Sequence, residues 1–178
     1  LDSVHLIHPG CKVSSQRNNN FVPCGPALLG RIIDGMGRPI DGKGPLLAPR
    51  REGFYAAPPN PLSRSMISEP FSTGIKSIDT FIPLGVGQRV GILAGSGVGK
   101  SILLGMIARG SDSDINVISL VGERGRELRE FVEKDLGVEG MKKTVIVVST
   151  SDQPAPMRIR ASILATAIAE GFRNDGSK

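Results

Sequence analysis

The second half of the chain alternates between two kinds of hydrophobic pattern. Three short runs are apolar almost throughout: RVGILAG (89–95), INVISLVG (115–122) and TVIVVST (144–150). Three other stretches carry apolar residues three and four positions apart: SILLGMIAR (101–109), GRELREFVEKDLG (125–137) and residues 155–173. The first pattern is typical of buried strands and the second of helices. Apolar strands bounded by helices predict an α/β fold whose mostly parallel sheet is covered on both faces.

The helical stretches each place their apolar residues on one face. The stripe of the second stretch contains Leu128, Phe131, Val132 and Leu136. The stripe of the last stretch contains Met157, Ala161, Leu164, Ala165, Ile168 and Phe172. We expect both stripes to pack on the sheet, because an amphipathic helix buries its apolar face. The series ends on a helix and no strand follows it.

The first half of the chain gives weaker signals. Residues 1–24 fit two short strands around an Asn-rich turn, as the last piece of a small β domain. GPALLGRII (25–33) has helical spacing and ends at a turn dipeptide. Residues 34–65 are rich in Gly and Pro and predict an ordered loop or linker, and TGIKSIDTFI (73–82) predicts a short helix. We therefore divide the chain into a β remnant (1–24), a linker with the start of the next domain (25–87) and an α/β core (88–178).

Composition and charge limit the classes of protein. The 178 residues are 39% hydrophobic with a net charge of +5, and no apolar run approaches the about 18 residues that cross a membrane. No signal-peptide pattern opens the sequence, so we expect a cytosolic protein. The positive charge leaves a nucleic-acid partner open, although no cluster of basic and aromatic residues indicates one. Cys11 and Cys24 have no spacing typical of a metal site.

The strongest chemical signal is a glycine-rich segment between a predicted strand and a predicted helix. It reads Ala94, Gly95, Ser96, Gly97, Val98, Gly99, Lys100 and Ser101. Glycines at alternate positions let backbone N–H groups converge on phosphate oxygens, and the helix N-terminus adds a partial positive charge. Lys100 can bind the β- and γ-phosphates of a nucleotide, and the Ser101 hydroxyl can bind Mg²⁺. Ala94 stands where the strictest phosphate-loop pattern has Gly.

Two further polar segments follow the next two predicted strands. Glu123 and Arg124 come at the end of the first, where a carboxylate can orient a water molecule and an arginine can neutralise phosphate charge. Glu123 can equally be an ordinary acid near a helix start. Asp152 belongs to the second segment, STSDQP, and its spacing favours a helix N-cap over a role in a site. Arg158 and Arg160 follow on the helix, where solvated arginines are common, although they could also reach phosphate or a neighbouring subunit.

These motifs together resemble the RecA-like nucleotide-binding domain of the rotary ATP synthase alpha/beta superfamily. The segments GPALLGRIIDGMGRPIDG, TGIKSIDTFIPLGVGQRVGILAGSGVGKSILLGMIAR, GERGRELREFVEKDLG and SDQPAPMRIRASILATAIAEGFR are most similar to the flagellar and type III secretion export ATPases. The likeness covers the chain from about Gly25 to Gly176. It implies that residues 1–24 end a β-barrel domain and that the Walker B strand lies beyond the sequence.

The resemblance also implies roles for single residues. Residues Gly95 to Ser101 are then the ATP-binding loop, Ser101 is the Mg²⁺ ligand, and Lys100, Glu123 and Arg124 act in catalysis. The implied function is ATP hydrolysis coupled to export of flagellar proteins. Without the Walker B aspartate and the interface arginine, we expect this stretch to hydrolyse ATP weakly or not at all. Gly171, and Ser162 with Ile163, depart from the family pattern and are expected to loosen the last helix.

The resemblance implies partners and leaves alternatives. The full-length family member forms a homohexamer at the inner face of the cell membrane, with export-gate and stalk proteins, export substrates and chaperones, and no nucleic acid. An injectisome rather than a flagellar system is one alternative. Others are a catalytic subunit of a proton-translocating ATP synthase or vacuolar-type ATPase, an RNA translocase, and a regulatory subunit without catalysis. Salt-dependent RNA binding would favour the translocase.

Overall fold

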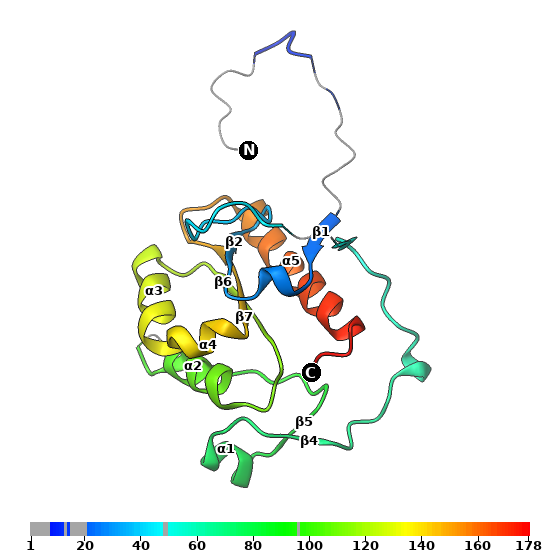
Figure 1. The fold of residues 1–178 in the computed structure, drawn as a ribbon, viewed down its shortest axis with the longest axis vertical. Coiled ribbons are helices and arrows are strands. Elements are labelled where there is room, and N and C mark those ends of the chain that lie inside the picture. Colours follow the sequence, from blue (N-terminus) through cyan, green and yellow to red (C-terminus); the bar gives the residue numbers. More distant parts are fainter. Residues whose placement is uncertain (1–7, 13, 15–20, 48–49, 96) are drawn as a thin grey trace.

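A computed structural model describes residues 8–12, 14, 21–47, 50–95 and 97–178 (Figure 1). Within these ranges the strands are β1 (Phe21–Cys24), β2 (Ile32–Asp34), β3 (Arg50–Gly53), β4 (Pro70–Phe71), β5 (Leu84–Gly85), β6 (Asn116–Val121) and β7 (Thr144–Ser149). The helices are the 3₁₀ turns η2 (Pro26–Leu28) and η3 (Pro61–Ser63), the π-helix η4 (Phe131–Leu136), and α1 (Lys76–Phe81), α2 (Lys100–Gly110), α3 (Gly125–Glu130), α4 (Gly137–Lys142) and α5 (Ala155–Asn174).

A parallel sheet with the strand order β2–β7–β6 forms the centre of the fold. All six residues of β7 are buried, as expected of a β-branched strand between two neighbours. Its side chains alternate between two core clusters: Val145 and Val147 pack with α5, and Ile146 and Val148 pack with α2 and η4. The prediction of a parallel sheet covered on both faces is therefore confirmed.

The amphipathic helices pack as their stripes predict. On α5, the buried residues include Ala161, Leu164, Ala165, Ile168 and Phe172. On the other face of the sheet, Phe131 and Leu136 are buried beside Leu128 and Val132. Fully burying one large aliphatic or aromatic side chain stabilises a fold by about 1.5–3 kcal/mol, so these two stripes supply much of the driving force for folding.

Residues 25–33 do not form the predicted helix. Pro26 begins a single 3₁₀ turn, and Gly30 then adopts a φ of +74° that a helix does not allow. The Gly30 N–H donates to the Thr144 carbonyl at 2.9 Å, which starts the pairing of β2 with β7. The helical spacing was misleading because the apolar residues at 32 and 33 join the sheet instead.

The loop after β2 is closed by a buried ion pair. Asp41 accepts hydrogen bonds from Arg31 Nε at 2.7 Å and Nη2 at 3.0 Å, and from the Ile32 N–H at 3.1 Å. The side chains of Arg31 and Asp41 are only 12% and 3% exposed. Hydrogen bonding to the Arg31 guanidinium holds the pKa of Asp41 well below its usual range. The predicted linker (34–65) is thus ordered at this end, and it also contains β3 and η3.

Residues 89–95, which we expected to form a strand, run as exposed chain. Leu93 is 96% exposed, and no strand among the described residues pairs with this segment. An apolar strand is stable only when neighbouring strands satisfy its backbone and bury its side chains. Within the described chain, residues 89–95 pair with neither edge of the parallel sheet and lack this support, so the predicted strand is wrong here.

A small antiparallel sheet joins β1 to β3, with Phe21 opposite Gly53. β1 matches the second of the two strands predicted in residues 1–24, whereas the first falls outside the described residues. Despite the departures from the family pattern, α5 runs without interruption through Ser162, Ile163 and Gly171. A Cβ at Gly171 would lie 2.8 Å from Cys24 Sγ, so the glycine lets α5 approach β1 closely.

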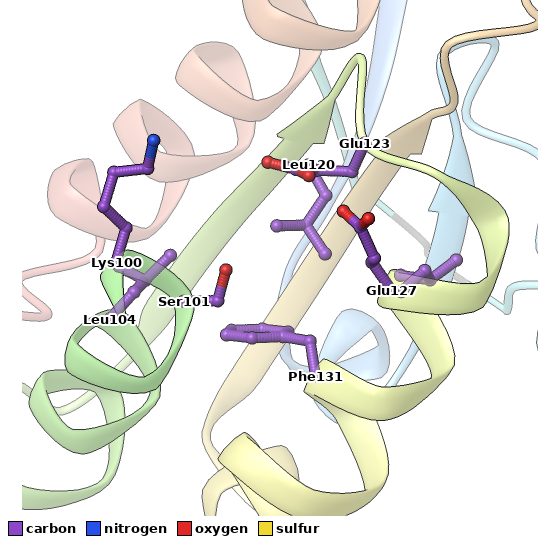
Figure 2. Close-up of a pocket in the computed structure, with 8 residues that line it drawn as sticks. Lys100, Ser101, Leu104, Leu120, Glu123, Glu127 and Phe131 are labelled. Carbon is purple, nitrogen blue, oxygen red and sulfur yellow. The ribbon is translucent and has the colours of Figure 1, made fainter. Parts of the chain in front are cut away.

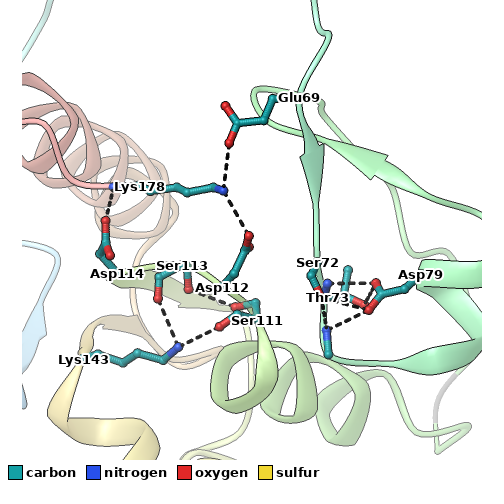
Figure 3. A network of polar contacts seen from close by, with 11 residues as sticks. Glu69, Ser72, Thr73, Asp79, Ser111, Asp112, Ser113, Asp114, Lys143 and Lys178 are labelled. Atoms are coloured by element: carbon teal, nitrogen blue, oxygen red, sulfur yellow. Dashed lines mark hydrogen bonds and ion pairs between the residues drawn. The ribbon is translucent and has the colours of Figure 1, made fainter.

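The predicted short helix, confirmed as α1, is tied to the strands around it by polar contacts (Figure 3). Asp79 accepts hydrogen bonds from the backbone and hydroxyl of Thr73, and these bonds lower its pKa. Lys178 Nζ contacts Asp112 at 3.0 Å and Glu69 at 3.3 Å.

Among the described residues, no helix is both long enough and apolar enough to span a bilayer.

Candidate functional site

The predicted phosphate loop leads directly into α2. Gly97 and Gly99 have φ values of +77° and +96°, a region that glycine adopts without steric cost, and α2 begins at Lys100. The Lys100 ammonium donates to the Ala94 carbonyl at 2.8 Å, so the lysine folds back over the loop. Ser96 lies outside the described residues. The described part of this segment is therefore a glycine turn followed directly by the start of α2.

A cavity of about 120 Å³ lies beside this helix start (Figure 2). Four polar residues line it: Lys100, Ser101, Glu123 and Glu127. Its remaining walls are apolar and come from Leu104, Leu120, Leu128 and Phe131. Figure 2 shows the Ser101 hydroxyl and both carboxylates directed toward the space between α2 and α3. The cavity therefore places cationic and hydroxyl groups on one wall and carboxylates on the other.

Glu123 reaches this cavity because β6 ends just before it. Gly122 turns the chain with a φ of +78°, and its N–H donates to the Ser149 carbonyl at 2.8 Å. The Glu123 carbonyl in turn accepts from the Ser151 N–H at 3.1 Å. The loop that carries Glu123 is therefore held by the loop that follows β7.

The pKa of the Glu123 carboxyl is raised. Partial burial is the main cause, hydrogen bonding and charge repulsion from Glu127 add to it, and the positive charge of Lys100 opposes it. Burial and a neighbouring carboxylate both favour the protonated form of Glu123. A bound cation would favour its ionised form.

Glu127 is a site residue that our reading of the sequence missed. It lies four residues after Glu123, in the first turn of α3, and lines the same cavity. The sequence GERGRE shows this second carboxylate, but Glu123 precedes the helix, so helical spacing alone does not bring the two carboxylates together.

The structure does not bring every predicted residue to the cavity. Arg124 does not line it; the Arg124 guanidinium lies 3.7 Å from the Glu127 carboxylate and is largely exposed. The cavity lining does not include the described loop residues before Lys100, which are Gly95, Gly97, Val98 and Gly99. Among the described residues of the phosphate loop, Lys100 and Ser101 are therefore the two that meet Glu123 across the cavity.

Asp152 is not the N-cap of α5. The N-cap is Pro154, and Asp152 lies in the preceding turn, where hydrogen bonds from the side chains of Thr150 and Gln153 and from its own backbone N–H lower its pKa. The predicted cap is wrong because α5 begins two residues later than the position of Asp152 suggested.

Arg160 stacks its guanidinium 4.2 Å from the centre of the Phe54 ring, so it is not simply solvated.

Known proteins with similar sequences are named as ATPases of flagella and of type III secretion systems. The flagellum-specific ATP synthase of Bacillus subtilis (strain 168) is 52% identical over 173 residues, which are 96% of this chain and 39% of that protein. The type 3 secretion system ATPase of Xanthomonas euvesicatoria is 50% identical over 155 residues, which are 87% and 35% of the two proteins. The chain thus spans roughly two fifths of the length of these relatives.

Solved structures agree with the sequence relatives. The assembled ATPase EscN from the type III secretion system of enteropathogenic E. coli superposes with a TM-score of 0.84 at 46% identity, over 98% of this chain and 42% of that one. The expected resemblance to flagellar and type III secretion ATPases is confirmed. The nucleotide-binding domain of the ATP synthase alpha/beta family matches residues 74–178, more than half of the sequence, and the chain belongs to this family.

Proposed function

We propose that the chain provides the Mg-ATP site of an ATPase that drives flagellar protein export. The observation that carries the proposal is the cavity in which Lys100 and Ser101, at the start of α2, face Glu123 at the end of β6. A phosphate loop and a carboxylate on opposite walls are the elements that ATP hydrolysis needs. The flagellum-specific relatives support the export role.

Each residue has a role that its position supports. The loop from Gly95 to Ser101 would hold the phosphates with its backbone N–H groups, and Lys100 would leave the Ala94 carbonyl for a phosphate oxygen. The Ser101 hydroxyl would bind Mg²⁺, whose preference for oxygen ligands also suits the two carboxylates opposite. When bound, Mg²⁺ supplies positive charge that neutralises the phosphates.

The carboxylates complete the proposed chemistry. Glu123 would orient the attacking water and accept its proton, which requires the ionised form, and bound Mg²⁺ and Lys100 both favour ionisation. Arg124 would have to leave Glu127 in order to reach a phosphate. In the longer protein we expect a homohexamer at the cytoplasmic face of the membrane, with stalk, export-gate, substrate and chaperone partners and no nucleic acid. The solved structure of the assembled ATPase EscN in complex with its central stalk EscO supports an assembly and a stalk partner.

Calorimetric titration of Mg-ATP into the 178-residue chain tests the site. We expect saturable binding that Lys100→Ala weakens at least about tenfold, as expected for the loss of a charged phosphate contact. Lys142→Ala is the matched control, because Lys142 lies on α4 outside the ATP cavity and binds Glu139. Absence of binding at millimolar Mg-ATP, or equal affinities of the two variants, would contradict the proposal.

A chimera tests the export role against an injectisome role. The Bacillus subtilis relative has a segment of matching length, which this chain can replace in the longer protein. Restored swimming would support flagellar export. The opposite result would favour an injectisome role, as in the type 3 secretion system ATPase of Xanthomonas euvesicatoria. In that case the flagellar chimera hydrolyses ATP without restoring swimming, and the corresponding chimera of a type 3 secretion ATPase restores secretion.

A further inference from the structure

Glu123, the residue proposed to activate water, lies in a short connection between β6 and α3. β6 ends at Val121 and α3 begins at Gly125. The Glu123 carboxyl is partly buried at the cavity, but the residue as a whole is exposed, so the packing of apolar side chains does not hold it. Because a displacement of about 1 Å can lower the rate of an enzyme about a hundredfold, such a residue needs another means of support.

Two backbone hydrogen bonds connect this segment to the turn after β7. The pairing of the two strands ends with Val121 opposite Ser149. Beyond that pair, the Gly122 N–H donates to the Ser149 carbonyl at 2.8 Å, and the Ser151 N–H donates to the Glu123 carbonyl at 3.1 Å. The second bond is made to Glu123 itself. Because a peptide group is planar, it fixes the orientation of the peptide that follows the Glu123 Cα.

The Ser151 N–H is in turn held in place by a β-turn. The Gln153 N–H donates to the Thr150 carbonyl at 3.0 Å, so Ser151 and Asp152 are the two central residues of the turn. The Asp152 carboxylate accepts from the side chains of Thr150 and Gln153 and from its own backbone N–H. Backbone and side-chain contacts therefore both fix the direction in which the Ser151 N–H points.

The charge of Asp152 is not what connects the turn to Glu123. The charges that shift the pKa of the Glu123 carboxyl belong to Glu127 and Lys100. Asp152 is exposed, so water and salt screen its charge. The influence of the turn on Glu123 therefore passes through the hydrogen bond from the Ser151 N–H.

We propose that Ser151 is a positioning residue of the ATP site, whose backbone N–H holds the Glu123 carbonyl, and that Asp152 holds the turn that presents this N–H. The serine hydroxyl has no part in this role. The positioning role rests on the proposed function, because it matters for catalysis only if Glu123 activates water. The hydrogen bond and its effect on the place of Glu123 do not depend on that function.

The substitution Ser151→Pro removes this donor and leaves the turn intact. Proline has no N–H, and its φ of about −65° suits the first central position of the common β-turns, which have a φ of about −60° there. Residue 151 is exposed, so the ring has room. Ser151→Ala is the matched control at the same position, because it removes the hydroxyl and keeps the N–H.

NMR of the 178-residue chain tests the contact directly. In the parent and in Ser151→Ala we expect a scalar coupling across the hydrogen bond, between the amide nitrogen of residue 151 and the carbonyl carbon of Glu123. Ser151→Pro should shift the signal of the Glu123 carboxyl carbon, and Ser151→Ala should not. Asp152→Ala should speed hydrogen exchange of the Ser151 amide about tenfold, as expected for the loss of turn contacts. Asp152→Asn keeps an acceptor oxygen and should restore most of the protection.

Kinetics test the positioning role in the longer protein made with the Bacillus subtilis relative. Ser151→Pro should lower kcat about tenfold or more with little change in KM, because an oriented water matters only in the transition state. Ser151→Ala should match the parent. In the 178-residue chain, both variants should bind Mg-ATP as the parent does, since neither touches the phosphate loop.

Three results would overturn the proposal. One is the absence of the coupling in the parent. Another is that Ser151→Pro and Ser151→Ala give the same Glu123 carboxyl shift or the same kcat. If Ser151→Pro does not fold, equal exchange of the Ser151 amide in Asp152→Ala and in the parent is the third. Failure of the Mg-ATP titration would contradict the ATPase function and leave the NMR result unaffected.

Discussion

The contact between α2 and the π-helix η4 depends on a glycine. A Cβ at Gly105 would lie 2.7 Å from the carbonyl oxygen of Asp135 and 2.9 Å from its carbonyl carbon and Cβ. Ordinary contacts of a Cβ begin at about 3.4 Å, so Gly105→Ala places a methyl group about 0.7 Å too close to a backbone. Since backbone atoms cannot rotate away as a side chain does, we expect the two helices to separate.

The magnitude follows from two opposing effects. Forcing an extra methyl group into a packed contact costs about 1–3 kcal/mol. Replacing Gly by Ala inside a helix stabilises it by about 0.8–1 kcal/mol. The net expectation for Gly105→Ala is a loss of about 1 kcal/mol in the free energy of unfolding. For a chain of this size, such a loss lowers the Tm by about 2–4 °C.

Urea unfolding followed by far-UV circular dichroism measures this change, because the chain has no Trp and one Tyr. Gly110→Ala is the matched control on the same helix, since a Cβ there would make ordinary contacts at 3.5 Å with Gly74 and Thr73. We expect the control to be neutral or slightly stabilising. If Gly105→Ala is as stable as Gly110→Ala, the close approach of the two helices is not what limits position 105.

Three further predictions concern charge and packing. Glu127→Gln should lower the pKa of Glu123, measured by NMR of its carboxyl carbon, because a hydrogen bond and a repulsion that raise it are lost; an unchanged pKa would refute the coupling. Asp41→Asn should destabilise the fold at pH 7. Because the pKa of Asp41 is depressed in the folded state, the parent should lose this stability as pH falls below about 4, where Asp41 of the unfolded chain takes up its proton first. Urea unfolding of the variant should lack this dependence on pH. Ile168→Ala should cost about 2–5 kcal/mol, whereas Ile159→Ala on the same helix, 64% exposed, should cost far less; equal losses would contradict the burial.

The elements that sequence pattern predicted correctly are those whose periodicity matches their burial. β7 is apolar at every position and is buried at every position, and the stripe on α5 is the buried face of that helix. For such segments the local pattern and the tertiary environment require the same structure. No information from distant residues was needed to identify them.

The failures occurred where distant residues decide the structure. Ile32 and Ile33 have helical spacing with their neighbours, yet they pair with Ile146 and Val147, more than a hundred positions away. Glu127 was missed because a site residue on a helix is recognised only when the end of a strand is known to lie beside it. Likewise, no spacing in the sequence reveals that the Ser149 hydroxyl at the end of β7 is buried.

The two walls of the proposed ATP site are positioned by different parts of the fold. Glu123 is fixed to the sheet, because β6 precedes it and the loop after β7 binds its backbone. Lys100 has no such connection, since the segment before it pairs with no strand in the described part of the chain. The position of α2 depends on its packing against β7 and η4, and Gly105 is where it approaches the backbone of η4 most closely. A change at that contact should move Lys100 relative to Glu123, so Gly105→Ala should weaken Mg-ATP binding in addition to lowering stability, whereas Gly110→Ala should do neither.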